Sequence, residues 1–493
     1  MTRRLRVLVC VTALSAVARF APPAAAQGAP SEQEVTVGTT TGSAPDVAVA
    51  DDGSWTVVWY GSTVSTGGDG GSGIYSRTFS AAGVPSLPVR LDVAPDLGSS
   101  PVIAAEAAGY VVEWASAGSG TLSNITARRL NADGTPRGAP FRVVTGVSYL
   151  QAITLAAAPD GRFVTAWSND AITAQPVSAS DVPQGGPVQV APPRSGLELG
   201  NSQPSVAMFT SGRFMVTWTY DSGAIGARND IRARLYSAAG VPASAAYQVN
   251  AFSLKLQFDP SVSVNAASTS VVTWTSEDTA TNLQDGSRSG VYGDFGGEFR
   301  LNDYITGPQY ASDVAVASDG FIAVWTSDAQ DGSGSGIYGA RYKPNRVRVG
   351  TEFRVNTVTA GSQSSPAVAV SPDGHAVIVW VDANMSRVVA VRTRVNAAVA
   401  GEPAPGAATP FSVSPNPAGP LGCTAQFVTD GAGPVRLAVV DVLGREVRVV
   451  LDGPVAAGEH TVEIRTASLP AGTYALRLVR GATHETRLFT VTR

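Results

Sequence analysis

Short stretches of alternating apolar and polar residues recur along most of the chain, separated by tight polar turns. Two of them are Asp46-Val47-Ala48-Val49 and Asp313-Val314-Ala315-Val316. A period of two residues predicts β-strands with one buried face. Asp-Gly pairs follow many of these stretches, as at Asp160-Gly161 and Asp373-Gly374, and they supply the positive φ angles that a β-hairpin requires. The pattern predicts an all-β fold built from antiparallel hairpins.

Tryptophan marks the period of this pattern. Seven of the eight tryptophans recur every 51–56 residues, at Trp59, Trp114, Trp167, Trp218, Trp274, Trp325 and Trp380. In each period a third strand follows a polar loop, and in all but the last a fourth strand follows, which ends in a Phe-x-Val-Asn-like segment such as Phe353–Asn356. Four antiparallel strands at this spacing are typical of one propeller blade, so we predict a seven-bladed β-propeller over residues 27–402. The tryptophans fit ligand platforms or core packing, and strand spacing in a repeat favours packing between blades.

The seventh repeat has three predicted strands and no fourth, because residues 396–401 run into a different kind of sequence. The segment Glu34–Val37, followed by Gly38–Gly42, resembles Phe353–Asn356 followed by Thr357–Gly361. We therefore expect the N-terminal segment to pair as the outer strand of the last blade and to close the ring, which covers an exposed sheet edge.

A second unit follows at the C-terminal end. Residues 401–422 are rich in Pro, Gly and Ala, and their prolines argue against helix and sheet interior. We assign 403–413 as a linker and 414–493 as a small Ig-like β-sandwich. Its strands are expected at Thr424–Val428, Val435–Val440, Glu446–Leu451, His460–Arg465, Thr473–Val479 and Thr486–Thr492.

Four motifs in this unit carry a family resemblance. They are Ser414-Pro415-Asn416-Pro417, Asp441-Val442-Leu443-Gly444-Arg445-Glu446-Val447, Gly458-Glu459-His460 and Leu469-Pro470-Ala471-Gly472-Thr473-Tyr474. In this order and spacing they resemble the type A C-terminal sorting domain of the Por (type IX) secretion system of Bacteroidetes-like bacteria. The resemblance implies a cleavable domain that directs passage through the outer membrane, with the sorting motif at Pro415, Asn416, Pro417, Asp441, Gly444, Arg445, Gly472 and Tyr474.

This sequence departs from the family at two places. Ser414 stands where the first motif usually begins with Tyr, and Arg493 ends the chain where Lys is frequent. The alternative to a sorting domain is an ordinary β-sandwich that binds something. The repeats carry a weaker resemblance of their own, since Trp325–Gly339 is similar to tandem repeats of large secreted and surface bacterial proteins, which implies an extracellular location and no chemistry.

The N-terminus has the pattern of a secretory signal peptide over residues 1–26. Arg3, Arg4 and Arg6 precede the apolar stretch Val7–Ala18, and Ala24-Ala25-Ala26 supplies a cleavage site. No later stretch reaches about 18 consecutive apolar residues, so we expect no membrane span after cleavage. The two ends of the chain together predict a secreted or cell-surface protein that is exported through the periplasm.

Composition narrows the function only slightly. Charged residues make up 15% of the chain and the formal net charge is −4, so no basic surface for nucleic acid is expected. Of the two cysteines, Cys10 lies in the signal peptide, and Cys423 alone cannot form an intramolecular disulfide. The 52 glycines and 32 prolines fit the many turns of a repeated four-stranded unit.

Candidate chemistry is sparse. The Asp-Gly-Ser-Gly loops offer oxygen ligands for Ca²⁺, with Asp328 and Asp331 in one loop and Asp285 in another, but their spacing matches no established calcium motif. The alternative is a hairpin loop made soluble by Asp and Gly, and no other cofactor is expected. The histidines at 375, 460 and 484 stand at neither metal-ligand nor catalytic-triad spacing.

Carboxylate pairs are harder to judge, because propellers can carry glycosidases that need two acids about 5–10 Å apart. The acids in loops and at strand ends are Glu106, Glu113, Asp170, Asp221, Asp230, Glu277 and Asp294. We expect most of them to be turn formers or solvated groups.

Three functions remain open at this stage. The first is a propeller module that binds a glycan or a protein and is exported by the type IX machinery. The second is a propeller enzyme that acts on extracellular polysaccharide, and the third is a structural spacer at the cell surface. The lack of a catalytic constellation favours the first.

Overall fold

The computed structural model describes residues 33–34, 42–62, 71–93, 98–169, 171–193, 201–221, 229–252, 256–277, 288–384, 386–395, 411–419, 422–429, 433–441, 445–456, 458–466, 468–480 and 483–491. These residues form strands and turns, and no helix occurs among them. The chain divides into two compact units, Met1–Arg348 with Glu352–Asn396, and Val349–Thr351 with Ala397–Arg493. The described part contains no helix long and apolar enough to cross a membrane.

The strands of the first unit form four-stranded antiparallel sheets, in each of which the strands lie side by side in a regular order. Sheet 1 contains β2 (Gly42–Val49), β3 (Trp55–Ser62), β4 (Ser72–Phe79) and β5 (Val89–Arg90). Sheet 2 contains β6 (Gly98–Glu106), β7 (Gly109–Ala117), β8 (Leu122–Asn131) and β9 (Pro136–Ser148). Sheet 3 contains β10 (Ala152–Ala157), β11 (Phe163–Ser168), β12 (Ile172–Val177) and β13 (Val188–Ala191).

The next sheets repeat the same order. Sheet 4 contains β14 (Ser202–Met208), β15 (Phe214–Asp221), β16 (Asn229–Tyr236) and β17 (Tyr247–Gln248). Sheet 5 contains β18 (Leu256–Val264), β19 (Ser270–Glu277), β20 (Ser289–Asp294) and β21 (Glu298–Arg300). Sheet 6 contains β22 (Gln309–Ala317), β23 (Gly320–Asp328), β24 (Ser335–Tyr342) and β25 (Arg348–Arg354). Sheet 7 contains β26 (Gln363–Val370), β27 (His375–Asp382), β28 (Arg387–Arg394) and β1 (Gln33–Glu34).

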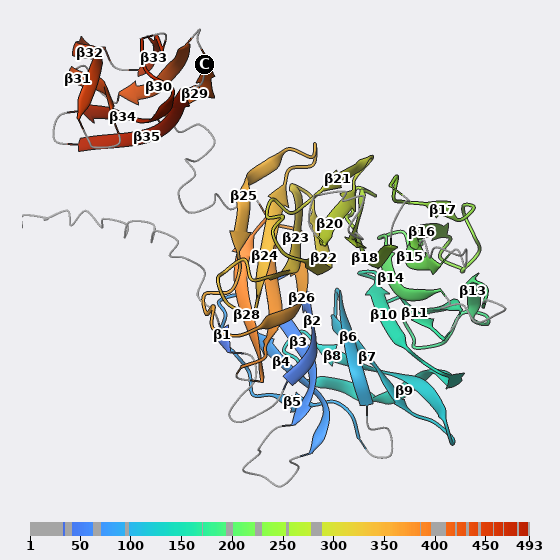
Figure 1. Ribbon diagram of the computed structural model, residues 1–493. Helices are drawn as coiled ribbons and strands as arrows, with labels where there is room; N and C mark the ends of the chain where they lie inside the picture. The colour runs from blue at the N-terminus through green and yellow to red at the C-terminus, as the bar shows by residue number, and fades with distance from the viewer. Residues whose placement is uncertain are drawn as a thin grey trace, which may run out of the picture. The chain divides into compact units, whose positions relative to one another are not determined.

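The sheets surround a common axis (Figure 1). The first strand of each sheet contacts the first strand of the next, and β26 of sheet 7 contacts β2 of sheet 1, which closes the ring. This radial stacking of antiparallel sheets is the arrangement of a β-propeller. Its physical basis is that each sheet has two apolar faces, which only a neighbour on either side can bury.

The outer strand of sheet 7 comes from the N-terminal end of the described chain. Gln33 pairs with Ala390 and Glu34 pairs with Val389 of β28, antiparallel. The N-terminal segment thus occupies the place left by the missing fourth strand of the seventh repeat. Residues 35–37 of the expected strand lie outside the described residues.

Deletion of residues 27–40 should lower the unfolding free energy of the ring by about 1–2 kcal/mol, because it removes the two-residue ladder on β28 and each net hydrogen bond contributes about 0.5–1.5 kcal/mol. Urea unfolding followed by tryptophan fluorescence measures the change, since all eight tryptophans lie in this unit. A shorter deletion of residues 27–31 retains β1 and serves as the control. Equal stability of the two deletion variants would show that β1 does not hold the ring closed.

The marker tryptophans pack in the core, as the repeat spacing predicts. All seven are buried, with at most 4% of the side-chain surface exposed. Trp59 joins a cluster with Val377 and Val379 of sheet 7, and Trp114 joins one with Ala48 and Val58 of sheet 1. Each therefore fills the space between two neighbouring sheets and none of them forms an open ligand platform.

The second unit is a separate β-structure with its own core. Its strands are β29 (Ser412–Gly419), β30 (Gly422–Thr429), β31 (Gly433–Val440), β32 (Glu446–Val455), β33 (Gly458–Ile464), β34 (Gly472–Arg480) and β35 (Thr483–Val491). They lie in the order β32-β31-β34-β35-β29-β30-β33. The core includes Phe411, Phe427, Leu437, Leu476 and Phe489. The six expected strands of this unit are all present.

Strand β29 contradicts the expectation that prolines keep residues 401–422 out of a sheet. Ser412–Ser414 pair with β30, and the next paired positions are Ala418 with β35 and Gly419 with β30. Pro415 and Pro417 fall in the interruption between these paired positions, where no ladder hydrogen bond from a backbone amide is required. The proline rule is obeyed locally, and the strand continues on either side of the break.

Candidate functional site

The inner strands of the ring share a distortion that the alternating pattern does not reveal. In six of the seven sheets the pairing of the first two strands shifts register, and a non-glycine residue there has positive φ: Ala44, Ser100, Gln203, Asp259, Ala311 and Ser365, with φ of 48–58°. Positive φ is uncommon for such residues, and β-bulges redirect neighbouring side chains. The bulge places the side chain two residues further on against the next sheet.

These redirected side chains connect the sheets around the axis. The backbone N–H of Ile103 donates to Asp46 Oδ2 at 2.8 Å, and that of Val368 donates to Asp313 Oδ2 at 2.7 Å. In the same way, the N–H of Val262 donates to Ser205 Oγ at 3.1 Å. Each bond runs from one sheet to the following one, so the bulge is part of the contact that holds neighbouring sheets together.

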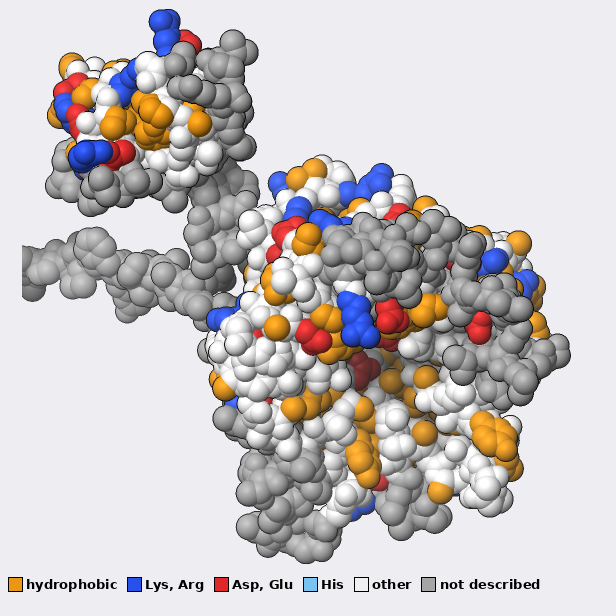
Figure 2. Space-filling model, in the orientation of Figure 1, with side chains coloured by type: hydrophobic (Ala, Val, Ile, Leu, Met, Phe, Trp, Pro, Cys, Tyr) orange, Lys and Arg blue, Asp and Glu red, His pale blue; other side chains and the backbone are white. Residues whose placement is uncertain are grey.

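Three of the inner-strand acids form the candidate site on the axis. Asp46, Asp259 and Asp313 are half-buried on β2, β18 and β22, and Figure 2 shows acidic side chains in the hollow at the centre of the ring. Burial, together with the nearby charge of Asp313, raises the pKa of Asp46 to about 7 and that of Asp259 to about 6. Burial also raises the pKa of Asp313. Such carboxyl groups can exchange protons near neutral pH.

The partners of these acids differ. Asp46 and Asp313 accept backbone hydrogen bonds, and Asp313 Oδ1 also accepts from Ser261 Oγ at 2.6 Å. Among the described residues, no hydrogen-bond donor to the Asp259 carboxylate is found. Asp259 is therefore the acid of the three that is best placed to act on a ligand entering the hollow.

Two of the three predicted calcium ligands, Asp328 and Asp331, lie in or beside the loop between β23 and β24. Asp328 Oδ1 accepts from Tyr310 Oη at 3.1 Å and from Ser335 Oγ at 2.7 Å. Asp331 Oδ1 accepts from the backbone N–H of Ser333 at 3.1 Å. Asp285 lies outside the described residues. Within the described ranges, no group of three His, Cys, Asp or Glu side chains is arranged to hold a metal ion.

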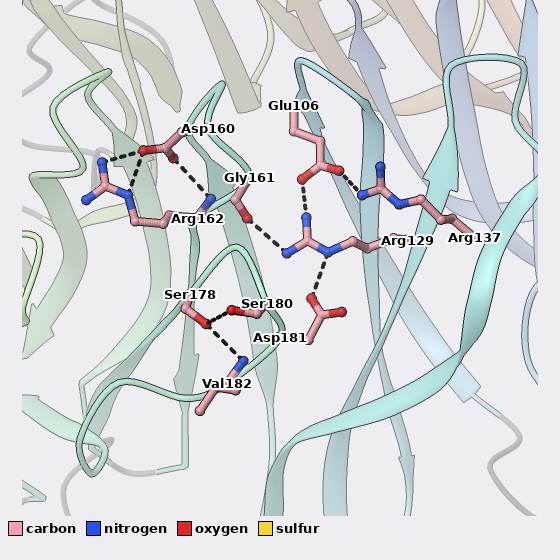
Figure 3. Close-up of polar contacts among 10 residues, drawn as sticks. All are labelled: Glu106, Arg129, Arg137, Asp160, Gly161, Arg162, Ser178, Ser180, Asp181 and Val182. Carbon is pink, nitrogen blue, oxygen red and sulfur yellow. Dashed lines mark hydrogen bonds and ion pairs between the residues drawn. The ribbon is translucent and has the colours of Figure 1, made fainter.

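Glu106 belongs to an ion-pair cluster where sheets 2 and 3 meet (Figure 3). Its side chain is 1% exposed, and its two oxygens accept from Arg129 Nη1 and Arg137 Nη2. Arg129 also donates from Nε to Asp181 Oδ1 at 2.7 Å and from Nη2 to the Gly161 carbonyl at 2.9 Å. Each of the three nitrogens of this guanidinium thus donates to a different residue, and two of these residues, Gly161 and Asp181, lie in turns of sheet 3. The Arg129 side chain therefore links sheets 2 and 3.

Glu113 is also buried, but it lacks such partners. Its side chain is fully enclosed on β7, and neither carboxylate oxygen has a hydrogen-bond partner among the residues that the structure describes. Burial raises its pKa to about 8, and the nearby Thr165 hydroxyl lowers it only partly. The group is therefore protonated at neutral pH inside the folded ring.

Most of the other acids that the sequence suggested for a carboxylate pair have hydrogen-bond partners in the protein or lie at strand ends. Asp230 Oδ1 accepts from Asn250 Nδ2 at 2.9 Å, and Asp294 Oδ1 accepts from the backbone N–H of Gly297 at 2.6 Å. Asp221 and Glu277 end strands β15 and β19. Asp170 lies outside the described residues. The positions of acids along the chain did not indicate Asp46, Asp259 or Asp313. Asp259 is itself a bulge residue, and Asp46 and Asp313 lie two residues after the bulge residues Ala44 and Ala311. This shared place in the repeat is the signal that could have found them once the bulge is known.

The motif residues of the second unit build turns. Asp441 accepts hydrogen bonds from Arg445, at 2.9 Å from its backbone N–H and at 2.8 Å from its Nε. Tyr474 Oη donates to the Pro470 carbonyl at 2.9 Å, which ties the start of β34 to the preceding turn. Gly472 opens β34 with a φ of 158°.

Of the remaining motif positions, Pro415, Asn416 and Pro417 lie within β29, and Gly444 lies outside the described residues. The lone Cys423 is buried in the core of this unit, and burial raises the pKa of its thiol, which fits a small apolar residue.

Comparison with known proteins gives a fold likeness without a family. No protein family matches the chain, and no curated protein matches it. Among solved structures, a protein of unknown function from Dyadobacter fermentans is similar, at 10% identity and a TM-score of 0.42, over 73% of this chain and 97% of that one.

Two further structures show the same level of likeness. The β-propeller domain of the Trilobed protease from Pyrococcus furiosus has 9% identity and a TM-score of 0.45, over 73% of this chain and 96% of that one. An α-L-arabinanase from Penicillium chrysogenum has 10% identity and a TM-score of 0.41, over 75% of this chain and 100% of that one. At these scores the likeness gives no indication of activity.

Proposed function

We propose that the chain is an exported seven-bladed β-propeller that binds an extracellular glycan or protein. Each four-stranded sheet is one blade, and the C-terminal unit is a type A sorting domain that engages the type IX secretion machinery. Residues 1–26 are a cleaved signal peptide, and the protein is released from the cell or held at its surface.

One observation carries the choice of binding over catalysis. In the described part of the ring, most of the acidic side chains near the axis and in the loops are held by the protein itself, and Asp259 is the exception that an opening for ligand would expose. Backbone amides hold Asp46 and Asp313, two arginines hold Glu106, and hydroxyl groups hold Asp328. Groups with such partners stabilise contacts between sheets and are poorly placed to exchange protons with a substrate.

The second candidate is an enzyme acting on extracellular polysaccharide. Asp259 favours it, because this acid lies near Asp313 at the axis and its pKa is raised to about 6. A glycan array and a turnover screen on the full chain separate the two candidates. Binding without turnover is the expected result, and turnover that is lost in Asp259→Asn would replace the binding function by the catalytic one.

Export is tested by the location of the protein in a bacterium that has the type IX system. We expect the full chain in the medium or on the cell surface, and a variant truncated after residue 402 in the periplasm. Replacement of Asp441 by Asn and Arg445 by Gln should reduce export severalfold, because it loosens the turn that the two side chains hold. The exposed pair Arg465→Gln and Glu463→Gln in the same unit is the control. Equal export of the full and truncated chains would refute the sorting function.

A further inference from the structure

Two of the sheet junctions are closed by the same pair of amide side chains. Asn302 Nδ2 donates to Gln309 Oε1 at 3.0 Å, and Asn356 Nδ2 donates to Gln363 Oε1 at 3.0 Å. All four side chains are buried. The Asn follows the outer strand of one sheet and the Gln opens the inner strand of the next, so this Asn–Gln pair fills the gap between sheets 5 and 6 and between sheets 6 and 7.

The junction of sheets 3 and 4 has shorter residues at both positions. Ala191, at the end of β13, occupies the position that Asn302 and Asn356 occupy in the repeats of sheets 5 and 6. Asn201 lies two residues before the bulge residue Gln203, just as Gln309 lies two residues before the bulge residue Ala311. Asn201 is therefore the equivalent of Gln309. A cavity of about 360 Å³ opens at this place, and residues of β13, β15 and β16 line it.

Two polar atoms beside the shorter pair have no hydrogen-bond partner among the described residues. In sheet 5, Trp274 Nε1 donates to Gln257 Oε1 at 2.8 Å. In sheet 4, Trp218 Nε1 and Asn201 Oδ1 are the corresponding atoms, and within the described residues both are buried without a hydrogen bond. Each side chain is only 2% exposed. Buried polar atoms without partners are costly, so a ligand that supplies those partners gains affinity.

The lining also selects the chemistry of the ligand. Trp218 and Arg232 are paired positions of β15 and β16, so Trp218, Tyr220, Arg232 and Arg234 lie on one face of the sheet. Arg232 is stacked 4.6 Å over Tyr220, and its buried Nε has no hydrogen-bond partner within the described ranges. None of the described lining residues is acidic. Two arginines favour a carboxylate, and the half-buried ring of Tyr220 beside them gives the wall an apolar surface that a sugar can contact.

We propose that this cavity binds one carboxylated sugar residue, a hexuronate at an end or branch of an acidic polysaccharide. The proposal deepens the binding function proposed above and rests on it. Arg232 and Arg234 receive the carboxylate, Trp218 Nε1 donates to a ring hydroxyl, and Asn201 Oδ1 accepts from another. The volume is at the lower end of the range for ligand pockets, which fits a single sugar residue.

Calorimetric titration of the full chain tests the proposal with trimers of galacturonate, glucuronate and mannuronate. Their methyl esters have the same ring geometry without the charge, and inorganic phosphate tests simple anion binding. At least one free trimer is expected to bind, with its ester at least tenfold weaker. Failure of all three trimers, or equal binding of phosphate, overturns the proposal. A hit on a neutral glycan would leave the broader binding function in place.

Two variants locate the site. Asn201→Gln restores the longer amide that Trp274 has in Gln257, so its Oε1 should take the hydrogen bond of Trp218 Nε1 in place of the ligand, weaken trimer binding and leave the protein at least as stable. Arg232→Gln should weaken binding about tenfold to a hundredfold, because it removes a charged hydrogen-bond donor. Arg300→Gln, an exposed arginine on β21, is the matched control and should bind normally. Unchanged binding in Asn201→Gln and Arg232→Gln would place the glycan elsewhere and refute this site.

Discussion

Replacement of Arg129 by Met should lower the unfolding free energy of the ring by about 3–5 kcal/mol, which is the usual cost of removing one partner from a buried ion pair. Arg129 is 5% exposed and holds Glu106, Asp181 and the Gly161 carbonyl at once. Met retains much of the packing over Phe163, whose ring centre lies 5.4 Å from the guanidinium. The loss is therefore chiefly electrostatic. Urea unfolding followed by tryptophan fluorescence measures it.

Arg162 provides the matched control. It pairs with Asp160 in the same region (Figure 3). Here, however, the Arg162 side chain is 35% exposed and the Asp160 side chain is 49% exposed. An ion pair in this setting contributes about 0–1 kcal/mol, so Arg162→Met should be nearly neutral. The double variant Arg129→Met with Glu106→Gln should recover part of the lost unfolding free energy. It removes the buried negative charge of Glu106, which in the single variant has only Arg137 as a partner among the described residues. Equal losses of unfolding free energy in Arg129→Met and Arg162→Met would show that the buried ion-pair cluster does not stabilise the contact between sheets 2 and 3.

The repeat could be predicted because its information is local. Alternation fixes which face of each strand is buried, Asp-Gly pairs fix the hairpins, and the tryptophan grid counts the sheets. The same locality explains the clear prediction of the strands in the second unit. It fails at β29, because Pro415 and Pro417 exclude only the positions they occupy, and the pattern does not show that pairing resumes at Ala418.

The candidate sites were harder to predict, since they depend on residues in different sheets. Asp46 and Asp313 look like ordinary strand residues until the bulges of β2 and β22 turn them toward the next sheet. The partner of Glu106 lies 23 residues away in Arg129, with nothing in the spacing to indicate it. The cavity beside Trp218 is different, because the short residues Ala191 and Asn201 stand out in the sequence once the structure has given the bulge positions on which to align the repeats.

The stability of the ring should fall as the pH rises from 5 to 8, with Glu113 as a main cause. Its pKa is raised to about 8 in the folded protein, against an ordinary value of 4.5. The unfolded chain therefore releases this proton first, so ionisation favours unfolding at every pH between the two values. The contribution of Glu113 to stability is complete below about pH 4.5 and is lost progressively up to about pH 8.

The size of the effect follows from the free energy of one pKa unit, about 1.4 kcal/mol. Between pH 5 and 8 this group alone should remove about 4 kcal/mol from the unfolding free energy of the ring. The raised pKa values of Asp46, Asp259 and Asp313 act in the same direction.

Glu113→Gln separates this group from the others. The neutral amide has the shape of the protonated acid, so the variant should match the wild type at pH 5 and exceed its stability at pH 8. Asp51→Asn, an exposed change in the turn after β2, is the control and should leave the pH profile unchanged. Urea unfolding at pH 5, 6, 7 and 8 gives the two profiles. If they ran parallel, Glu113 would be ionised within the fold, and an unseen partner would have to balance its charge.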